Sequence, residues 1–235
     1  MQIDIITAFP VMLSAPLQES MIGRAVKSGL ASIYIHDLRD WTHDKHHTID
    51  DTPYGGGAGM VYKIEPLFEC LQDLIDKSGD RKRQLILTSP RGEVFNQDRA
   101  VRFSLLDQLI IICGHYKGVD ERIKAFFPIV EVSIGDFVLS GGEIPAAAIA
   151  DAVVRLVPGV LGDADSAFSD SFNDNLLDCE YYTRPENFRG KKVPAVLLSG
   201  DHKKIDAWRL ERKEIITRER RPDLYKKYKR HIKIK

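Results

Sequence analysis

The chain has 235 residues, of which 43% are hydrophobic and 29% are charged, and this composition is typical of a globular protein with one large or two ordinary domains. No apolar run approaches the roughly 18 residues that a membrane-spanning helix needs. The N-terminal residues lack the basic-then-apolar pattern of a signal peptide, so we expect a cytoplasmic protein with no membrane partner. Three widely spaced cysteines (Cys70, Cys113 and Cys179) argue against a disulfide framework or a zinc knuckle.

The net charge of zero hides an uneven distribution. Residues 201–235 hold 14 Lys and Arg against 6 Asp and Glu, a balance of +8, so the first 200 residues carry −8. A basic C-terminal segment on an acidic body favours a partner rich in phosphates, such as a nucleic acid. The charges alone leave a solvated helical surface as the alternative.

Apolar and β-branched runs predict five strands, and helical spacing predicts helices between them. The expected strands are residues 3–6, 33–35, 84–88, 109–113 and 129–133. The expected helices are a short one after Pro10 and those at residues 20–28, 65–77, 96–105, 119–126 and 143–156. Because strands alternate with helices, the fold class is α/β, with a parallel sheet covered by helices on both faces.

The composition and periodicity of the sequence change after Gly159. Gly, Pro, Ser and Asp replace the periodic pattern, and basic helical sequence resumes near residue 205. We therefore predict an α/β domain over residues 1–160, an interdomain linker over 161–175 and a small basic, all-α domain over 176–235.

Three of the predicted strands end in loops that contain glycine. The loops are T-S-P-R-G (88–92), C-G-H-Y-K-G (113–118) and S-I-G-D-F-V-L-S-G-G (133–142). The carboxyl ends of parallel strands meet at one edge of a sheet, where open α/β sheets bind ligands. Glycine brings bare backbone N–H and C=O groups to such a ligand, although glycines that serve only the turns are the alternative.

A fourth glycine-rich segment, P-Y-G-G-G-A-G-M, occupies residues 53–60. It is no phosphate-binding loop of the usual kind, because Met60-Val61 stands where Lys-Ser/Thr is needed. A main-chain surface that lies against a flat base fits better, and a flexible lid without a specific contact remains the alternative.

Histidines cluster just before that segment, at His43, His46 and His47, with Asp50 and Asp51 nearby. On a helix they could bind a metal ion, which would suggest a metal-dependent hydrolase. The local composition favours a loop, however, so polar contacts to RNA phosphates or plain solvation are better interpretations, and we predict no metal ligands.

Five motifs in order give the chain a resemblance to a known family. They are P-Y-G-G-G-A-G-M (53–60), G-H-Y-K-G-V-D-E-R (114–122), S-I-G-D-F-V-L-S-G-G-E (133–143), R-L-V-P-G-V-L-G (155–162) and S-F-N-D-N-L-L-D-C-E-Y-Y-T-R-P (171–185). Together they resemble the bacterial tRNA (guanine-N1)-methyltransferases of the trefoil-knotted SPOUT superfamily, over nearly the whole chain.

The resemblance implies a fold, a reaction and partners. The α/β body would carry a C-terminal trefoil knot, which general folding rules would not predict, and a helical domain would hold tRNA. The enzyme would transfer a methyl group from S-adenosylmethionine to N-1 of the guanine 3′-adjacent to the anticodon (position 37), leaving S-adenosylhomocysteine. It would act as a homodimer with the active site at the subunit interface. The family is described as magnesium-assisted, yet no carboxylate cluster suggests a Mg²⁺ site.

The same resemblance assigns roles to individual residues. Asp170 would be the general base, and Arg155 would stabilise the charge that builds on the guanine carbonyl oxygen. The substrate would contact Gly55, Gly56, Gly57, Asp50 and Ser166. The cofactor would contact Leu87, Ser89, Pro90, Gly114, Tyr116, Ile134, Gly135, Asp136, Phe137, Val138, Leu139, Gly141, Gly142 and Pro145.

One residue departs from the family pattern, and two other functions stay open. Lys117 stands where members often carry an acidic residue, which predicts an altered contact to the methionine end of the cofactor. A different knotted RNA methyltransferase would not need Asp170 as a base. A non-catalytic RNA-binding module would not retain S-adenosylmethionine.

Overall fold

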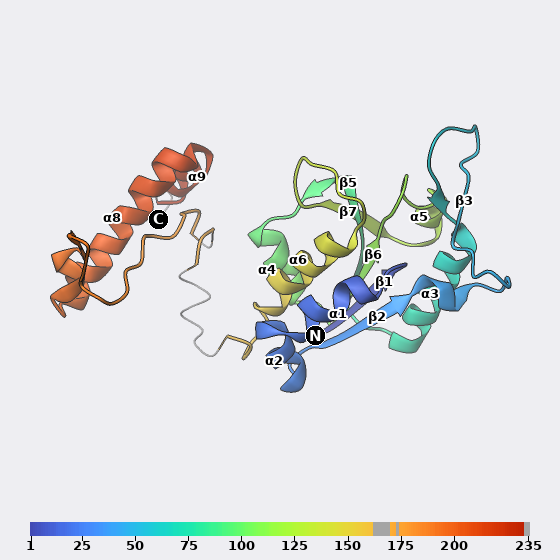
Figure 1. The fold of residues 1–235 in the computed structure, drawn as a ribbon, viewed down its shortest axis with the longest axis horizontal. Helices are drawn as coiled ribbons and strands as arrows, with labels where there is room; N and C mark the ends of the chain where they lie inside the picture. The colour runs from blue at the N-terminus through green and yellow to red at the C-terminus, as the bar shows by residue number, and fades with distance from the viewer. Residues whose placement is uncertain (162–169, 173, 233–235) are drawn as a thin grey trace. The chain divides into compact units, whose positions relative to one another are not determined.

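The computed structural model describes residues 1–161, 170–172 and 174–232. The chain divides into two compact units, Met1–Gly162 and Asp163–Lys235. Figure 1 shows the first unit as a sheet flanked by helices and the second as a pair of helices with an extended segment. No helix in the described part of the chain is both long enough and apolar enough to cross a membrane.

The first unit is built on a five-stranded sheet in the order β2-β1-β6-β5-β7. All four pairings are parallel, as the alternation of strands and helices predicted. The strands are β1 (Gln2–Thr7), β2 (Ser32–Asp37), β5 (Arg83–Val94), β6 (Gln108–Cys113) and β7 (Ile129–Ser133). Every residue of the central strand β6 is buried, as expected for a strand covered on both faces.

Helices cover both faces of this sheet. Along β6, Leu109 and Ile111 join one hydrophobic core, and Ile110 and Ile112 join the other. The first core contains residues of α1 (Val11–Gln18), α2 (Ser20–Lys27), α4 (Gln97–Ser104) and α6 (Glu143–Val154). The second contains residues of α3 (Ile64–Ser78), α5 (Ile123–Phe126) and the 3₁₀ helix η1 (Leu38–Trp41). The period-two alternation of the strands therefore divides the apolar side chains between two layers.

Helix α5 is shorter than the predicted helix over residues 119–126, and the reason lies in its N-terminal half. Gly118 accepts a hydrogen bond from the Tyr62 N–H (3.0 Å), and Asp120 donates one back to the Tyr62 carbonyl (3.0 Å). These bonds hold residues 118–120 in an extended conformation beside β4 (Val61–Tyr62), which pairs antiparallel with β3 (Asp50–Asp51). A helix therefore cannot begin before this contact ends.

Strand β5 continues beyond the predicted end at residue 88. It pairs with β7 up to Thr88, shifts register, and pairs again at Glu93 and Val94. Gly92 lies so close to the backbone of β7 that a Cβ atom there would collide with it. The segment between the two pairings, residues 89–92, is thus an interruption held within a strand rather than a free loop.

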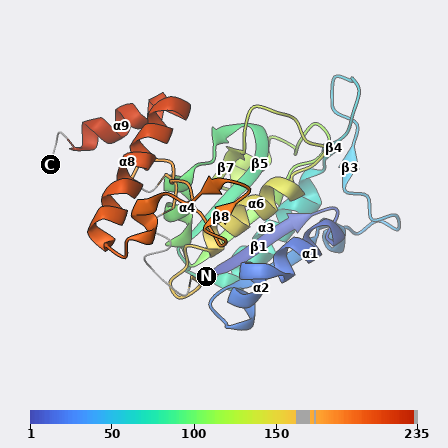
Figure 2. The same cartoon turned by 60° about the vertical axis from the view of Figure 1, so that its left-hand side comes forward.

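The second unit contains α8 (His202–Arg220) and α9 (Pro222–Ile232). Helix α8 begins before the predicted residue 205 because the Asp201 side chain accepts a hydrogen bond from the Lys204 N–H. The prediction of an all-α domain over residues 176–235 is wrong in part, because this segment also holds a short antiparallel strand pair, β8 (Asn187–Phe188) and β9 (Lys191–Lys192) (Figure 2). Arg189 and Gly190 between the two strands have positive φ angles, which form a tight turn that pairs them. The 3₁₀ helix η2 (Ala195–Leu198) follows.

An ion-pair network holds the interruption in β5. Glu131 on β7 pairs with Lys124 of α5 and with Arg91 of the interruption (3.2 Å), while Arg91 also reaches Glu121 (3.4 Å). Partial burial alone would raise the pKa of Glu131, but the hydrogen bond from Lys124 and the charge of Arg91 outweigh it and hold that pKa below its ordinary value. The ionised carboxylate therefore stabilises the folded state.

We predict that Glu131→Gln lowers the free energy of unfolding at pH 7 but not in acid. A carboxyl whose folded pKa is depressed stabilises the protein above its ordinary pKa, here 4.5, and loses that contribution as the pH falls through the folded pKa. Urea unfolding from pH 7 to pH 3 should show the difference from wild type shrinking below about pH 4.5. Glu121→Gln, with its side chain 64% exposed, is the matched control and should differ little at any pH. A gap that stays constant between pH 7 and pH 3 would contradict this account.

Candidate functional site

The carboxyl ends of β5, β6 and β7 meet at one pocket. Its walls come from the interruption in β5, the loop after β6 and the segment between β7 and α6. Of the residues predicted to bind a cofactor, all but the exposed Asp136 line it, namely Leu87, Ser89, Pro90, Gly114, Tyr116, Ile134, Gly135, Phe137, Val138, Leu139, Gly141, Gly142 and Pro145. The structure therefore brings together residues from three loops that lie up to 58 positions apart.

Glycines allow these loops to approach one another. The Gly142 N–H donates a hydrogen bond to the Gly114 carbonyl (2.8 Å). A Cβ atom at Gly142 would collide with the Thr88 side chain, and it would lie 2.7 Å from the Gly114 nitrogen. The three loops thus touch through their main chains, and much of the pocket wall is backbone.

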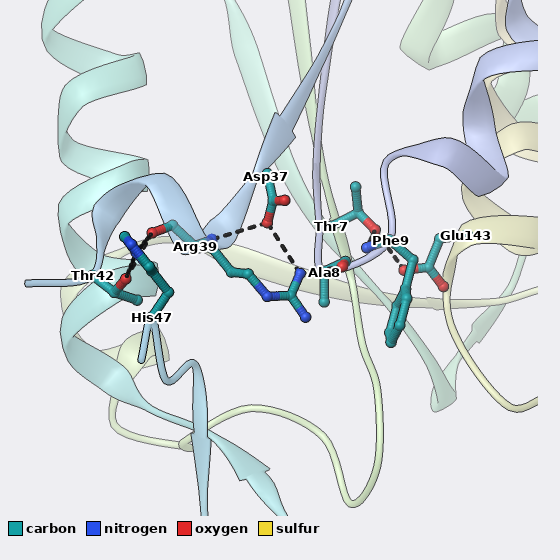
Figure 3. A network of polar contacts seen from close by, with 8 residues as sticks. All are labelled: Thr7, Ala8, Phe9, Asp37, Arg39, Thr42, His47 and Glu143. Atoms are coloured by element: carbon teal, nitrogen blue, oxygen red, sulfur yellow. Dashed lines mark hydrogen bonds and ion pairs between the residues drawn. The ribbon is translucent and has the colours of Figure 1, made fainter. Parts of the chain in front are cut away.

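A buried carboxylate lies directly behind this wall, in the first turn of α6. Glu143 is 1% exposed. It accepts a hydrogen bond from the Thr7 hydroxyl at the end of β1 (2.6 Å), and its other oxygen lies 2.7 Å from Nε2 of His115 in the loop after β6. Figure 3 shows the Thr7–Glu143 bond, with Phe9 beside it. One carboxylate therefore joins a strand end, a pocket loop and a helix start.

Aromatic rings enclose this carboxylate and its histidine. The His115 ring packs against Phe9 (4.7 Å between ring centroids) and stacks near Tyr62 (6.5 Å). The Tyr62 hydroxyl is buried and has no hydrogen-bond partner among the described residues, and burial together with the Glu143 charge raises its pKa. The Glu143 side of the pair is buried (1% exposed) and the His115 side chain is 11% exposed, so the pair lies in a setting of low dielectric that strengthens it.

The glycine-rich segment is an open loop between β3 and β4. Gly55, Gly56 and Gly57 have φ angles of 86°, 76° and 109°, and a Cβ atom at any of them would meet nothing within 4 Å. Their left-handed conformations explain the glycines, and the open space leaves main-chain groups accessible to a ligand. Tyr54, at the start of the loop, is fully exposed.

Lys117 and Tyr116 connect this loop to the cofactor-side pocket. The Lys117 N–H donates to the Met60 carbonyl (3.0 Å), and the Lys117 side chain lies so near Gly59 that a Cβ there would be 3.1 Å from it. Tyr116 has φ +55°, and partial burial and a hydrogen bond to Asp50 raise its pKa. Tyr116, predicted for the cofactor, is thus in contact with Asp50, predicted for the substrate.

The chemistry of the pocket fits S-adenosylmethionine. Backbone groups of three glycine-containing loops can bond the polar adenine edge and the amino acid part, while Leu87, Ile134 and Pro145 offer apolar surface to a flat ring. Lys117 also lines the pocket, so its ammonium can reach a carboxylate there.

The histidine segment is engaged in contacts of another kind. His43 Nε2 lies 2.7 Å from the Glu69 carboxylate, and His47 Nδ1 lies 2.8 Å from the Thr42 hydroxyl (Figure 3). Across residues 1–161, 170–172 and 174–232, no group of three His, Cys, Asp or Glu side chains could hold a metal ion.

The two predicted catalytic residues belong to different units. Arg155 is the half-buried C-cap of α6, and its N–H donates to the Asp151 carbonyl (3.1 Å). Asp170 is half-buried in the second unit, just before Ser171, whose hydroxyl accepts from the Asp178 N–H (2.9 Å). Ser166 lies outside the described residues.

Sequence reasoning missed the Thr7–Glu143–His115 contacts. Glu143 was seen only as the start of a helix, and Thr7 only as the residue after a strand. The sequence signal that could have indicated them is a charged residue, Glu143, directly after Gly141-Gly142 at the start of a predicted helix.

Comparisons with known proteins identify the family of the whole chain. The chain matches the family model "tRNA (Guanine-1)-methyltransferase TrmD" over residues 1–227. A tRNA (guanine-N(1)-)-methyltransferase of Chlorobaculum tepidum is 51% identical over 95% of this chain and 96% of its own length. Proteins of the same name from Dehalococcoides mccartyi (51%, over 97% of this chain and 91% of the relative) and Clostridioides difficile (46%, over 97% and 98%) are similarly related. The chain therefore belongs to the tRNA (guanine-N1)-methyltransferase family.

Proposed function

We propose that the chain transfers a methyl group from S-adenosylmethionine to N-1 of the guanine at position 37 of tRNA, next to the anticodon on its 3′ side. The observation that carries the proposal is the backbone-walled pocket at the carboxyl edge of the sheet, in a chain about half identical to relatives named tRNA (guanine-N(1)-)-methyltransferase.

The cofactor would be held by the three pocket loops. Gly114 and Gly142 supply closely approaching main chain, and Leu139 and Pro145 supply apolar contact. S-adenosylmethionine supplies an electrophilic methyl group when it is bound. Lys117 would contact the carboxylate of its methionine part, since an ammonium would repel the amino group.

The chain's own contribution to the reaction is proton removal and charge stabilisation. Neutral guanine carries a proton on N-1, so that nitrogen is a poor nucleophile until the proton leaves. Asp170 would accept this proton, and the guanidinium of Arg155 would stabilise the negative charge that develops on the carbonyl oxygen. Both side chains are half-buried, which favours defined positions over free solvation.

The open glycine loop would receive the guanine. Main chain at Gly55, Gly56 and Gly57 can lie flat against a base, and Asp50 and Ser166 would make further substrate contacts. The surplus of positive charge in residues 201–235 suits the tRNA backbone, so residues 176–235 would form the tRNA-binding domain and residues 161–175 the linker.

We also propose the trefoil knot and the homodimer that the family resemblance implies. The bridge between His115 and Gly141 supports the knot, because the chain after β7 returns to the loop after β6. Exposed apolar side chains on α1 and around the start of α6 support a dimer with the active site at the interface. They are Phe9, Val11, Met12, Val138, Leu139 and Ile144, with Val11 84% and Val138 85% exposed.

We predict that Asp170→Asn lowers the rate of methyl transfer by about 10²–10⁴-fold, because the amide cannot accept the N-1 proton. The assay uses labelled S-adenosylmethionine, tRNA transcripts carrying guanine or adenine at position 37, and nucleoside analysis of the digest. Wild type should form 1-methylguanosine only on the guanine transcript. Asp174→Asn, an exposed carboxylate nearby, is the control and should retain most activity. Label on another nucleoside would rule out the proposed substrate, and full activity of Asp170→Asn would rule out Asp170 as the general base.

We predict that Val11→Glu dissociates the dimer, since it introduces a charge into an apolar interface. Sedimentation equilibrium should give a dimer for wild type and a monomer for the variant, and methyl transfer should fall with dissociation. Val101→Glu on α4, at a site 41% exposed, is the matched control and should leave the dimer intact. A dimeric Val11→Glu would rule out α1 as the interface.

A further inference from the structure

The β8–β9 hairpin lies within the proposed tRNA-binding domain and carries an aromatic and basic surface that has no assigned contact. Between residues 184 and 192 the chain has four basic side chains, Arg184, Arg189, Lys191 and Lys192, against one acidic side chain, Glu186. Phe188 stands among them and is 62% exposed. An exposed aromatic ring among side chains with a net charge of +3 suits a ligand that has both a flat group and negative charge.

The hairpin has a defined geometry. Its two turn residues, Arg189 and Gly190, have φ angles of 49° and 83°, which is the pattern of the tight turns that suit the twist of paired strands. The Asn187 side chain accepts a hydrogen bond from the Gly190 N–H (3.0 Å), and the Val193 N–H donates to the Glu186 carbonyl (2.9 Å). The side chains of the hairpin are therefore presented in a fixed arrangement.

The pairing register sorts these side chains between two faces. Phe188 lies opposite Lys191, and Asn187 lies opposite Lys192. Directly opposite residues of an antiparallel pair share a face, and neighbours along a strand alternate. Phe188 and Lys191 are therefore on one face, and Lys192 is on the other.

The turn adds a second flat group to the face of Phe188. The Arg189 guanidinium carbon lies 5.4 Å from the centroid of the Phe188 ring, in a cation–π contact. Within the part of the chain that the structure describes, neither Arg189 nor Lys191 forms an ion pair with a carboxylate. The two cations are exposed and keep their charge available to an outside ligand.

We propose that this face binds an unpaired segment of tRNA, with a base stacked on Phe188 and Arg189 and a backbone phosphate at Lys191. Proteins recognise unpaired RNA by stacking bases on aromatic rings and guanidinium planes beside basic side chains. The charge of the hairpin favours such a ligand over an apolar or basic protein surface. The proposal rests on the proposed function, since it assumes a tRNA substrate.

The test measures the affinity of each variant for an unmodified tRNA transcript across a range of salt concentrations. Phe188→Ala should weaken binding about tenfold or more, because one stacked base is lost. Lys191→Ala should lower the slope of log Kd against log salt by about 0.7, as expected for one phosphate contact on a single strand. Lys192→Ala removes the same charge from the opposite face and should leave that slope unchanged. Phe188→Tyr keeps the ring and should bind as wild type.

Methyl-transfer kinetics separate this proposal from the proposed function. Phe188→Ala should raise KM for tRNA and leave kcat and the affinity for S-adenosylhomocysteine unchanged, which shows that the cofactor site is intact. Circular dichroism of Phe188→Ala should match wild type, which checks the fold of the unit that carries the hairpin. If wild type forms no 1-methylguanosine, the proposed function fails. If wild type forms 1-methylguanosine but Phe188→Ala and Lys191→Ala bind tRNA as tightly as wild type, only the hairpin proposal is overturned. The same holds if Lys192→Ala lowers the salt slope as much as Lys191→Ala does.

Discussion

The buried carboxylate of Glu143 is the constraint on which the pocket depends. A carboxylate removed from water costs several kcal/mol unless its oxygens find partners. Both oxygens do, one at the Thr7 hydroxyl and one at His115. Helix α6 can therefore pack against the sheet only when the end of β1 and the loop after β6 are in place. The interaction fixes three segments at once, and Gly141 is required between them because a side chain there would collide with His115 and Glu143.

This arrangement explains why the proposed ligand sites are built from main chain. Loops that touch through glycines leave little room for side chains, so backbone groups form the surface that a ligand meets. Tyr116 adopts a left-handed conformation within that surface, and its hydrogen bond to Asp50 connects it to β3, just before the glycine-rich loop. Strain of this kind persists only where the surroundings fix it. Tyr116 thus links the proposed cofactor side to β3, which precedes the open glycine-rich loop of the proposed guanine side.

The local sequence pattern was enough to predict the strands, most helices and the loops at their ends, because hydrophobic alternation and the conformational effect of glycine extend over only a few residues. It was not enough where long-range pairing decides. Thr7 and Glu143 are 136 positions apart, so no local sequence pattern could predict their hydrogen bond. P-R-G after Thr88 suggested a loop, whereas pairing with β7 resumes at Glu93. The contact with Tyr62 likewise shortens α5 in a way that the helical spacing could not reveal. The roles of Asp170 and Arg155 rest on the family resemblance.

Several acidic side chains of the second unit form contacts within that unit, which affects how its net charge is presented to solvent. Glu214 accepts hydrogen bonds from Tyr228 (3.1 Å) and Lys229 (2.8 Å) and so joins α8 to α9, while Asp223 pairs with Arg221 (2.7 Å). These carboxylates are consumed by local contacts that hold the unit together. The surplus of positive charge is left on exposed side chains, such as Lys203, Lys226 and Lys227, that no carboxylate within the described residues pairs with. Because Glu214 and Asp223 are engaged within the unit while these lysines are exposed, the positive charge outweighs the negative charge that faces solvent. Such a surface would attract a polyanion, and the proposed role of the β8–β9 hairpin adds a contact that only an unstacked base can make.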